Sequence, residues 1–260
     1  MLRNFKSFKK MLCCLSVLTC LLYNSTAFSQ DSDDSVTSYK DKKIELVHGN
    51  GEPTHAIIWL HGLGASANDF PPIVPELGLS SEQSIRFVFP QAPDRPITVN
   101  GGMVMPGWYD IKGMDIADKQ DASGMAESKA YLDELIAAQI ALGIPSENMI
   151  IAGFSQGGAV AYHTGIRSEH KLAGILALST YIPFAEQAAD EQSKVNIQTP
   201  ILAHHGDHDP VVPVQLGKAS ADLLIDLGYS LEWQTYPMQH QVVIEQIQEI
   251  GAWINTVFNN

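Results

Sequence analysis

The sequence predicts an α/β fold, in which a mostly parallel central sheet has helices on both faces. Short apolar runs alternate with helix-length amphipathic stretches, which is the rhythm of repeated strand–helix units. Several of the runs are almost continuously Ile, Leu, Val and Ala, as expected for strands covered on both faces. The chain has 260 residues, 45% of them hydrophobic and 17% charged, which fits one large folded domain.

Seven strands and four long helices are expected within a single domain over residues 30–260. Gly143 and Gly228 directly follow two of the expected helices, and glycine commonly ends helices. No repeat or linker argues for a second domain. The expected strands are 43–48, 56–60, 85–89, 149–152, 172–178, 201–205 and 230–236, and the expected helices are 122–142, 156–168, 214–227 and 242–258.

One long stretch breaks this rhythm. Residues 90–121 contain many Gly, Pro and Met and show no clear period. Loops of this length in compact domains are usually functional. Trp108, Tyr109 and Met105 are therefore candidates for lining an apolar substrate pocket. The alternative is that the aromatic side chains pack against their own loop.

The first 29 residues have the layout of a signal peptide. Basic residues precede an apolar run over 11–23, and no acidic residue occurs in this segment. The run is too short to cross a bilayer comfortably, and Ala27 and Ser29 are small residues at positions −3 and −1 of a cut after Ser29. We therefore expect cleavage, export to the periplasm or the medium, and a polar leader over 30–38. An uncleaved membrane anchor is the alternative.

All three cysteines, Cys13, Cys14 and Cys20, lie in this segment. Cleavage would leave no thiol for a disulfide, a nucleophile or a metal site. A lipid anchor at Cys20 is an alternative, but Thr19 is a poor residue before a modified cysteine. Cleavage would also make the net charge four units more negative than −13. An acidic surface repels nucleic acid and anionic membranes, so we expect no nucleic-acid partner and no stable membrane insertion after cleavage.

A Gly-Phe-Ser-Gln-Gly pattern at 153–157 lies between an expected strand and an expected helix. That is the context of a nucleophile elbow, a turn so tight that only small residues fit beside the serine. The pattern alone is weak, because a glycine-rich turn with a capping serine looks the same. Its position between strand and helix favours Ser155 as a catalytic nucleophile.

A serine hydroxyl needs a histidine to take its proton and a carboxylate to orient that histidine. In this architecture the acid and the histidine follow the serine in that order. Asp209 comes after the strand at 201–205, and His240 comes between the last strand and the last helix. We therefore predict Asp209 as the acid and His240 as the base. Asp207 competes for the acid role, but its earlier position favours bracing the loop.

The same segment admits a metal site, since it holds imidazole and carboxylate groups. Its candidate ligands are His204, His205, Asp207, His208 and Asp209. Alternation along a strand points His204 and His205 to opposite faces, so they do not converge on one ion. We expect no metal and no cofactor.

Ester hydrolysis also needs N–H donors for the negatively charged oxygen that develops at the carbonyl. One donor is expected from the residue after the nucleophile, Gln156, and the other from Leu63 in the loop 61–64. A plain glycine turn is the alternative for this loop. His61 is expected to anchor the loop in the sheet rather than to act in catalysis.

Together these segments resemble the phospholipase/carboxylesterase family, which includes the acyl-protein thioesterases. The resemblance implies an α/β-hydrolase fold without a large cap domain, a Ser155–Asp209–His240 triad, and hydrolysis of carboxylic esters, with thioesters or lysophospholipids as substrates of some members. His208 stands where many members have cysteine, and the expected export differs from a mostly cytosolic family. The motifs that carry the resemblance lie at 61–64, 89–93, 106–110, 153–158 and 206–213, with His240 after them.

The sequence therefore predicts a cofactor-independent serine carboxylesterase. Residues 180–199 are too few for an inserted cap, so an open site for small-molecule esters with short or medium acyl chains is expected. Acyl thioesterase or lysophospholipase activity is an alternative, as is a non-catalytic binding protein on the same scaffold. A dienelactone-hydrolase-like enzyme would need a cysteine nucleophile. No oligomeric state is predicted.

Overall fold

The computed structural model describes residues 38–113 and 119–259. The predicted signal segment, and the predicted leader except its last residue, lie outside them, so cleavage and export stay predictions. Within the described residues, no helix is both long and apolar enough to span a bilayer.

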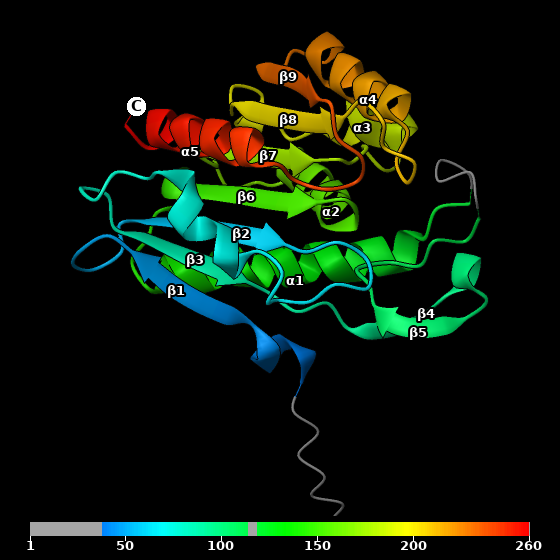
Figure 1. Cartoon of the computed structure of the whole chain (residues 1–260), viewed down its shortest axis with the longest axis horizontal. Helices are drawn as coiled ribbons and strands as arrows, with labels where there is room; N and C mark the ends of the chain where they lie inside the picture. The colour runs from blue at the N-terminus through cyan, green and yellow to red at the C-terminus, as the bar shows by residue number, and fades with distance from the viewer. Residues whose placement is uncertain (1–37, 114–118, 260) are drawn as a thin grey trace, which may run out of the picture. The chain divides into compact units, whose positions relative to one another are not determined.

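A seven-stranded sheet forms the centre of the described part of the chain, in the order β1-β3-β2-β6-β7-β8-β9 (Figure 1). Strand β1 pairs with β3 in the antiparallel direction, and every other neighbouring pair is parallel. The mostly parallel sheet is therefore confirmed. Its strands are β1 (Ile44–His48), β2 (His55–Leu60), β3 (Ile85–Phe89), β6 (Met149–Phe154), β7 (Gly174–Leu178), β8 (Ile201–Gly206) and β9 (Leu231–Tyr236).

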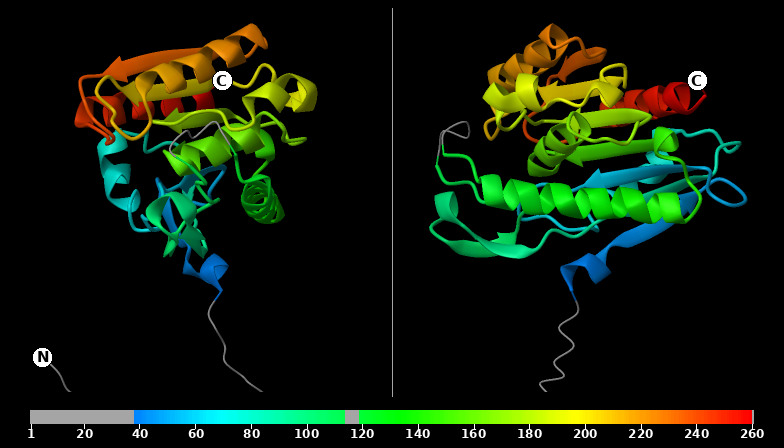
Figure 2. Two further views of the ribbon diagram at one scale, coloured as in Figure 1. Left: turned by 90° about the vertical axis from the view of Figure 1, so that its right-hand side faces the viewer. Right: turned by 180° about the vertical axis from the view of Figure 1, so that it is seen from behind.

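Helices cover both faces of this sheet (Figure 2). Side chains alternate along β2: Ile58 joins a core cluster that holds residues of α1, α2 and α4, whereas Ile57 joins a cluster that holds residues of η2 and α5. Each face of the sheet therefore has its own apolar core. The longest helices are η2 (Pro71–Leu77), α1 (Ala122–Ala141), α2 (Gln156–Gly165), α4 (Val214–Asp226) and α5 (Ile244–Phe258).

The glycines predicted to end helices do so. Gly143 and Gly228 have φ of +90° and +93°, a region that glycine reaches without steric cost. The Gly143 N–H donates to the Ile140 carbonyl and the Gly228 N–H to the Ile225 carbonyl, both at 2.9 Å.

The stretch 90–121 is more regular than its sequence indicates. It contains an antiparallel hairpin of β4 (Asp94–Ile97) and β5 (Met103–Pro106), a two-stranded sheet of its own. The expectation of an irregular loop throughout is therefore wrong. Pro96 and Pro106 hide the strands, since proline cannot donate to a ladder and is tolerated only where no donor is required.

No large cap domain interrupts the fold between β7 and β8. Residues 179–200 hold only η5 (Ala185–Gln187), α3 (Ala188–Glu191) and η6 (Lys194–Asn196). These short helices do not form a cap domain over the carboxyl end of the sheet, as predicted.

Helix α5 approaches η2 so closely that a side chain at Gly251 has no room. A Cβ there would lie 1.6 Å from the Leu77 carbonyl oxygen. Helix propensity alone would make Gly251→Ala stabilising by about 1 kcal/mol. Because the clash is with backbone, we expect overpacking to dominate and the free energy of unfolding to fall by about 3 kcal/mol. Urea unfolding of the variant measures the change.

The neighbouring position supplies the control. Ala252 is exposed on the same helix, so Ala252→Gly should cost only the propensity difference of about 1 kcal/mol. An unchanged or increased stability of Gly251→Ala would show that α5 and η2 are not in close contact.

Two buried histidines couple stability to pH. His163 in α2 is 8% exposed and His204 in β8 is 2% exposed. Burial, with the nearby charges of Arg167 and Lys129, lowers the pKa of His163 to about 3. Burial also lowers the pKa of His204 to about 4, although Glu249 acts in the opposite direction.

Both pKa values lie below the value of about 6.5 expected in the unfolded chain. Between that value and the folded pKa, the unfolded chain binds protons that the folded chain does not, so stability decreases as the pH falls. From pH 7 to pH 5 we expect a loss of about 2 kcal/mol for each of these histidines. Urea unfolding at both pH values measures it, and His204→Gln should reduce the dependence. Equal stability at the two pH values would contradict the prediction.

Candidate active site

Ser155 occupies a strained turn between β6 and α2. Its φ of 53° and ψ of −121° belong to a region that non-glycine residues rarely adopt. Neighbouring strand ends hold the turn: the Ser155 N–H donates to the Leu178 carbonyl at 2.8 Å, and the Thr180 hydroxyl donates to the Ser155 carbonyl at 2.7 Å. The serine is therefore held at the carboxyl end of the sheet.

Steric contact explains the glycines around this serine. A Cβ at Gly153 would lie 2.2 Å from the carbonyl carbon of Gly157, and a Cβ at Gly157 would lie 2.4 Å from the Leu60 carbonyl oxygen. Both contacts are with backbone and cannot be relieved by a side-chain rotation. The predicted need for small residues in the turn is confirmed.

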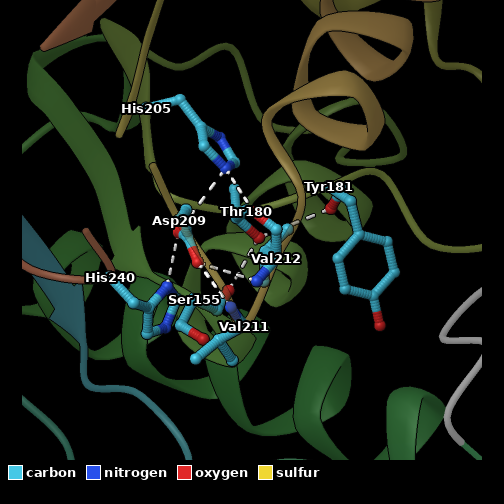
Figure 3. A network of polar contacts seen from close by, with 8 residues as sticks. All are labelled: Ser155, Thr180, Tyr181, His205, Asp209, Val211, Val212 and His240. Carbon is cyan, nitrogen blue, oxygen red and sulfur yellow. Dashed lines mark hydrogen bonds and ion pairs between the residues drawn. The ribbon is translucent and has the colours of Figure 1, made fainter. Parts of the chain in front are cut away.

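Asp209 and His240 meet beside this turn (Figure 3). His240 Nδ1 donates to Asp209 Oδ2 at 2.7 Å. The His240 ring also packs against the ring of Phe154, with 4.7 Å between centroids. Because Phe154 precedes Ser155, the three residues predicted as a triad are gathered at the carboxyl ends of β6, β8 and β9.

Asp207, the competing acid, lies elsewhere. Its backbone N–H donates to the Tyr236 carbonyl at 2.8 Å, while its side chain is exposed. Within the described residues its carboxylate has no hydrogen-bond partner, so the expectation that it braces the loop is wrong.

Hydrogen bonds keep the Asp209 carboxylate ionised. Its side chain is fully buried, and burial alone would raise its pKa. The bond from His240 and the N–H groups of Val211 and Val212, which donate to Oδ1 at 2.8 and 2.9 Å, outweigh burial and hold the pKa below its usual value. Asp209 can thus stabilise a positive charge on His240.

The two predicted oxyanion donors belong to segments next to Ser155. A Cβ at Gly62 would be 3.5 Å from the Ser155 Cβ, so the loop 61–64 lies against the serine. Gln156 begins helix α2, where N–H groups have no partner inside the helix. Across the described part of the chain, neither the Leu63 N–H nor the Gln156 N–H has a hydrogen-bond partner. Both are available for a ligand oxygen.

His61 anchors this loop, as expected. Its Nδ1 donates to the Gly62 carbonyl at 2.7 Å, and its Nε2 accepts from the Ala92 N–H at 3.1 Å. Burial lowers the pKa of His61, against the effects of the Gly62 bond and of Asp69, so the neutral ring fits these bonds.

Hydrogen bonds of Trp108 and Tyr109 connect the loop 61–64 to Gln156 at the start of α2. The Trp108 indole N–H donates to the His61 carbonyl at 2.8 Å, and its backbone N–H donates to Gln156 Oε1 at 2.7 Å. The Gln156 amide donates in turn to the Tyr109 carbonyl at 2.6 Å. Trp108 is only 1% exposed, so the structure favours bracing for the two aromatics over their predicted role as pocket walls. Half-buried Met105, beside Gly64, stays a predicted pocket residue.

Comparison with known proteins adds an independent observation. The family model described as phospholipase/carboxylesterase matches residues 41–258. The chain belongs to the phospholipase/carboxylesterase family. Among its relatives, acyl-protein thioesterase 1 of Neurospora crassa is 38% identical over 218 residues, which cover 80% of this chain and 89% of that protein. Acyl-protein thioesterase 1 of Gibberella zeae is 39% identical over 210 residues, with 77% and 89% covered.

Two solved structures are similar to this chain over most of its length. SOBER1 of Arabidopsis thaliana matches with a TM-score of 0.74 and 30% identity, over 78% of this chain and 98% of that one. Acyl-protein thioesterase 2 of Zea mays matches with a TM-score of 0.72 and 26% identity, over 83% and 99%. The α/β-hydrolase fold is thus shown by both architecture and likeness.

The two histidines of β8, His204 and His205, point to opposite faces of the sheet. His204 lines a hollow with Glu249 and Trp253 of α5, whereas His205 contacts Gly217 of α4. The predicted alternation is confirmed. Within residues 38–113 and 119–259, no group of three or more His, Cys, Asp or Glu side chains is placed to hold one metal ion.

Two site residues were missed by sequence reasoning. Thr180 holds the Ser155 carbonyl, and Tyr181 bonds through its hydroxyl to that of Tyr109 at 2.8 Å. They are the second and third residues after β7 ends at Leu178, so their place at the carboxyl end of a central strand was the available signal.

Proposed function

We propose that this chain is a serine carboxylesterase that hydrolyses carboxylic esters with short or medium acyl chains through an acyl-enzyme intermediate. The observation that carries the proposal is the bond between ionised Asp209 and His240 beside the strained turn at Ser155. A buried carboxylate that orients a histidine next to a half-buried elbow serine is the arrangement that activates a hydroxyl nucleophile.

In the proposed cycle, the Ser155 Oγ attacks the ester carbonyl carbon while His240 takes the hydroxyl proton. The N–H groups of Leu63 and Gln156 stabilise the oxyanion, each by about 3 kcal/mol. His240 then gives its proton to the leaving alcohol. A water molecule, deprotonated by His240, attacks the carbonyl carbon of the acyl-enzyme. His240 then returns that proton to the Ser155 Oγ as the bond to the acyl group breaks, which releases the acid and the free serine.

Thioester hydrolysis is the second candidate, because the relatives from Neurospora crassa and Gibberella zeae are named acyl-protein thioesterase 1. A thioester differs from an ester only in its leaving group, so the same residues serve both reactions. We further propose that the chain is exported, on the strength of its N-terminal segment. Export favours small ester substrates met outside the cytoplasm over acylated cytosolic proteins.

The test has two parts. A fluorophosphonate probe reports an activated serine, and labelling is expected in wild type. A panel of p-nitrophenyl esters of increasing acyl length, acyl thioesters and lysophospholipids then ranks kcat/KM. Highest kcat/KM for short esters supports the proposal, and preference for thioesters selects the second candidate. Absence of both labelling and hydrolysis would favour a binding protein.

A further inference from the structure

A second imidazole faces the Asp209 carboxylate. His205, at the end of β8, is fully buried, and its Nε2 lies 3.6 Å from Asp209 Oδ2. His240 Nδ1 bonds to the same oxygen at 2.7 Å. Figure 3 shows the two rings approaching this oxygen from different directions. The proposed cycle uses His240 and leaves His205 without a role.

The contacts of His205 fix its proton and its orientation. Nε2 lies 2.9 Å from the Val212 carbonyl oxygen, and a carbonyl only accepts, so Nε2 carries the proton. Burial lowers the pKa of His205, against opposing effects of the Val212 bond and Asp209, which agrees with a neutral ring. A Cβ at Gly217 would lie 2.4 Å from Nδ1, and the Trp233 ring centroid is 5.7 Å away. The ring therefore has little freedom to turn.

This arrangement is unfavourable for stability alone. The bare Nδ1 is buried and has no hydrogen-bond partner among the described residues. Burial of an unpaired polar atom destabilises a fold, and an apolar side chain would avoid that cost. The feature that an apolar side chain could not supply is the N–H directed at the loop 209–212, which carries the acid Asp209 and is called the acid loop below.

That N–H bonds to Val212, which in turn bonds to the Asp209 carboxylate. Val212 donates its backbone N–H to Asp209 Oδ1 at 2.9 Å and accepts from His205 through its carbonyl. His205 thus fixes the backbone of Val212, and Val212 fixes one oxygen of Asp209. The other oxygen is then left to face His240.

We propose that His205 is a positioning residue for Asp209, which it holds through the Val212 carbonyl and through its own N–H beside Oδ2. The inference rests on the proposed function. Misplacing catalytic groups by about 1 Å can lower rates by about 100-fold, so the acid loop needs such support.

Two substitutions separate the donor from the bulk of the ring. His205→Leu removes the N–H, whereas the amide of His205→Gln can still donate to Val212. With ester substrate, and with active sites counted by fluorophosphonate titration, we expect the leucine variant to lose kcat by about 10- to 100-fold with KM within about twofold. The glutamine variant should recover most of this loss.

His204→Gln, on the opposite face of the same strand, is the matched control and should keep wild-type kcat. Should the leucine variant fail to fold, His205→Asn, whose amide is too short to reach Val212, replaces it.

A second readout does not depend on turnover. The proton between His240 Nδ1 and Asp209 gives a downfield ¹H resonance, which should shift or broaden in the donor-free variant and return in His205→Gln. Wild-type kcat and an unchanged resonance in the donor-free variant would overturn the proposal, as would equal damage from leucine and glutamine. If wild type neither labels nor hydrolyses esters, the proposed function fails, and the resonance still decides whether His205 positions Asp209.

Discussion

Replacing Ser155 with alanine is expected to lower kcat for p-nitrophenyl butyrate by about 10⁵- to 10⁶-fold. The substitution deletes the only atom that forms the acyl-enzyme in the proposed cycle. Asp209 and His240 stay bonded to each other but have no hydroxyl to deprotonate. The oxyanion donors and substrate binding alone leave a residual acceleration of about 10³-fold over water.

The same substitution should leave the fold intact. Alanine and serine share a Cβ, so the backbone strain at φ 53° is the same for both, and the unfolding free energy should change by less than about 0.5 kcal/mol. Initial-rate kinetics, fluorophosphonate labelling and urea unfolding measure the three effects. Ser81→Ala changes an exposed serine and should keep full activity and labelling. Residual activity above about 1% of wild type in a labelled Ser155→Ala protein would identify another nucleophile.

The turn that carries Ser155 could be predicted because all of its determinants are neighbours in sequence. The apolar strand, the two glycines at which an added Cβ would lie 2.2 and 2.4 Å from backbone atoms, and the following helix are contiguous in sequence, so the pattern encodes the turn directly. Asp209 and His240 were predictable for a different reason. Because the strands before them are parallel to β6, their carboxyl ends meet at the same edge of the sheet.

Long-range packing explains what could not be predicted. The prolines in β4 and β5 conceal a hairpin whose two strands pair with each other in a separate two-stranded sheet. The bracing role of Trp108 depends on which backbone carbonyl lies beside its indole, here that of His61, 47 residues earlier in the chain. The alternation of side chains along a strand predicted that His205 and His204 lie on opposite faces of the sheet. It could not predict that Gly217 of α4 makes room for the His205 ring.

Asp209→Asn is expected to lower kcat by about 10⁴-fold while the local structure persists. Oδ1 accepts the N–H groups of Val211 and Val212, so the asparagine must keep its oxygen there. Its NH₂ then faces His240 Nδ1. Two donors cannot bond, and His240 changes to the tautomer with a bare Nδ1 and a protonated Nε2. The nitrogen left for Ser155 can no longer accept the hydroxyl proton.

Asp207→Asn is the matched control, because it makes the same chemical change two residues earlier on an exposed side chain. It should leave kcat within about twofold of wild type, as is usual for surface substitutions. Steady-state kinetics on both variants, with fluorophosphonate labelling rates as a second measure of serine activation, compares the two carboxylates. Loss of activity in Asp207→Asn with retention in Asp209→Asn would reassign the acid. The opposite result ties catalysis to the one carboxylate that is buried, ionised and bonded to His240, rather than to negative charge in the loop.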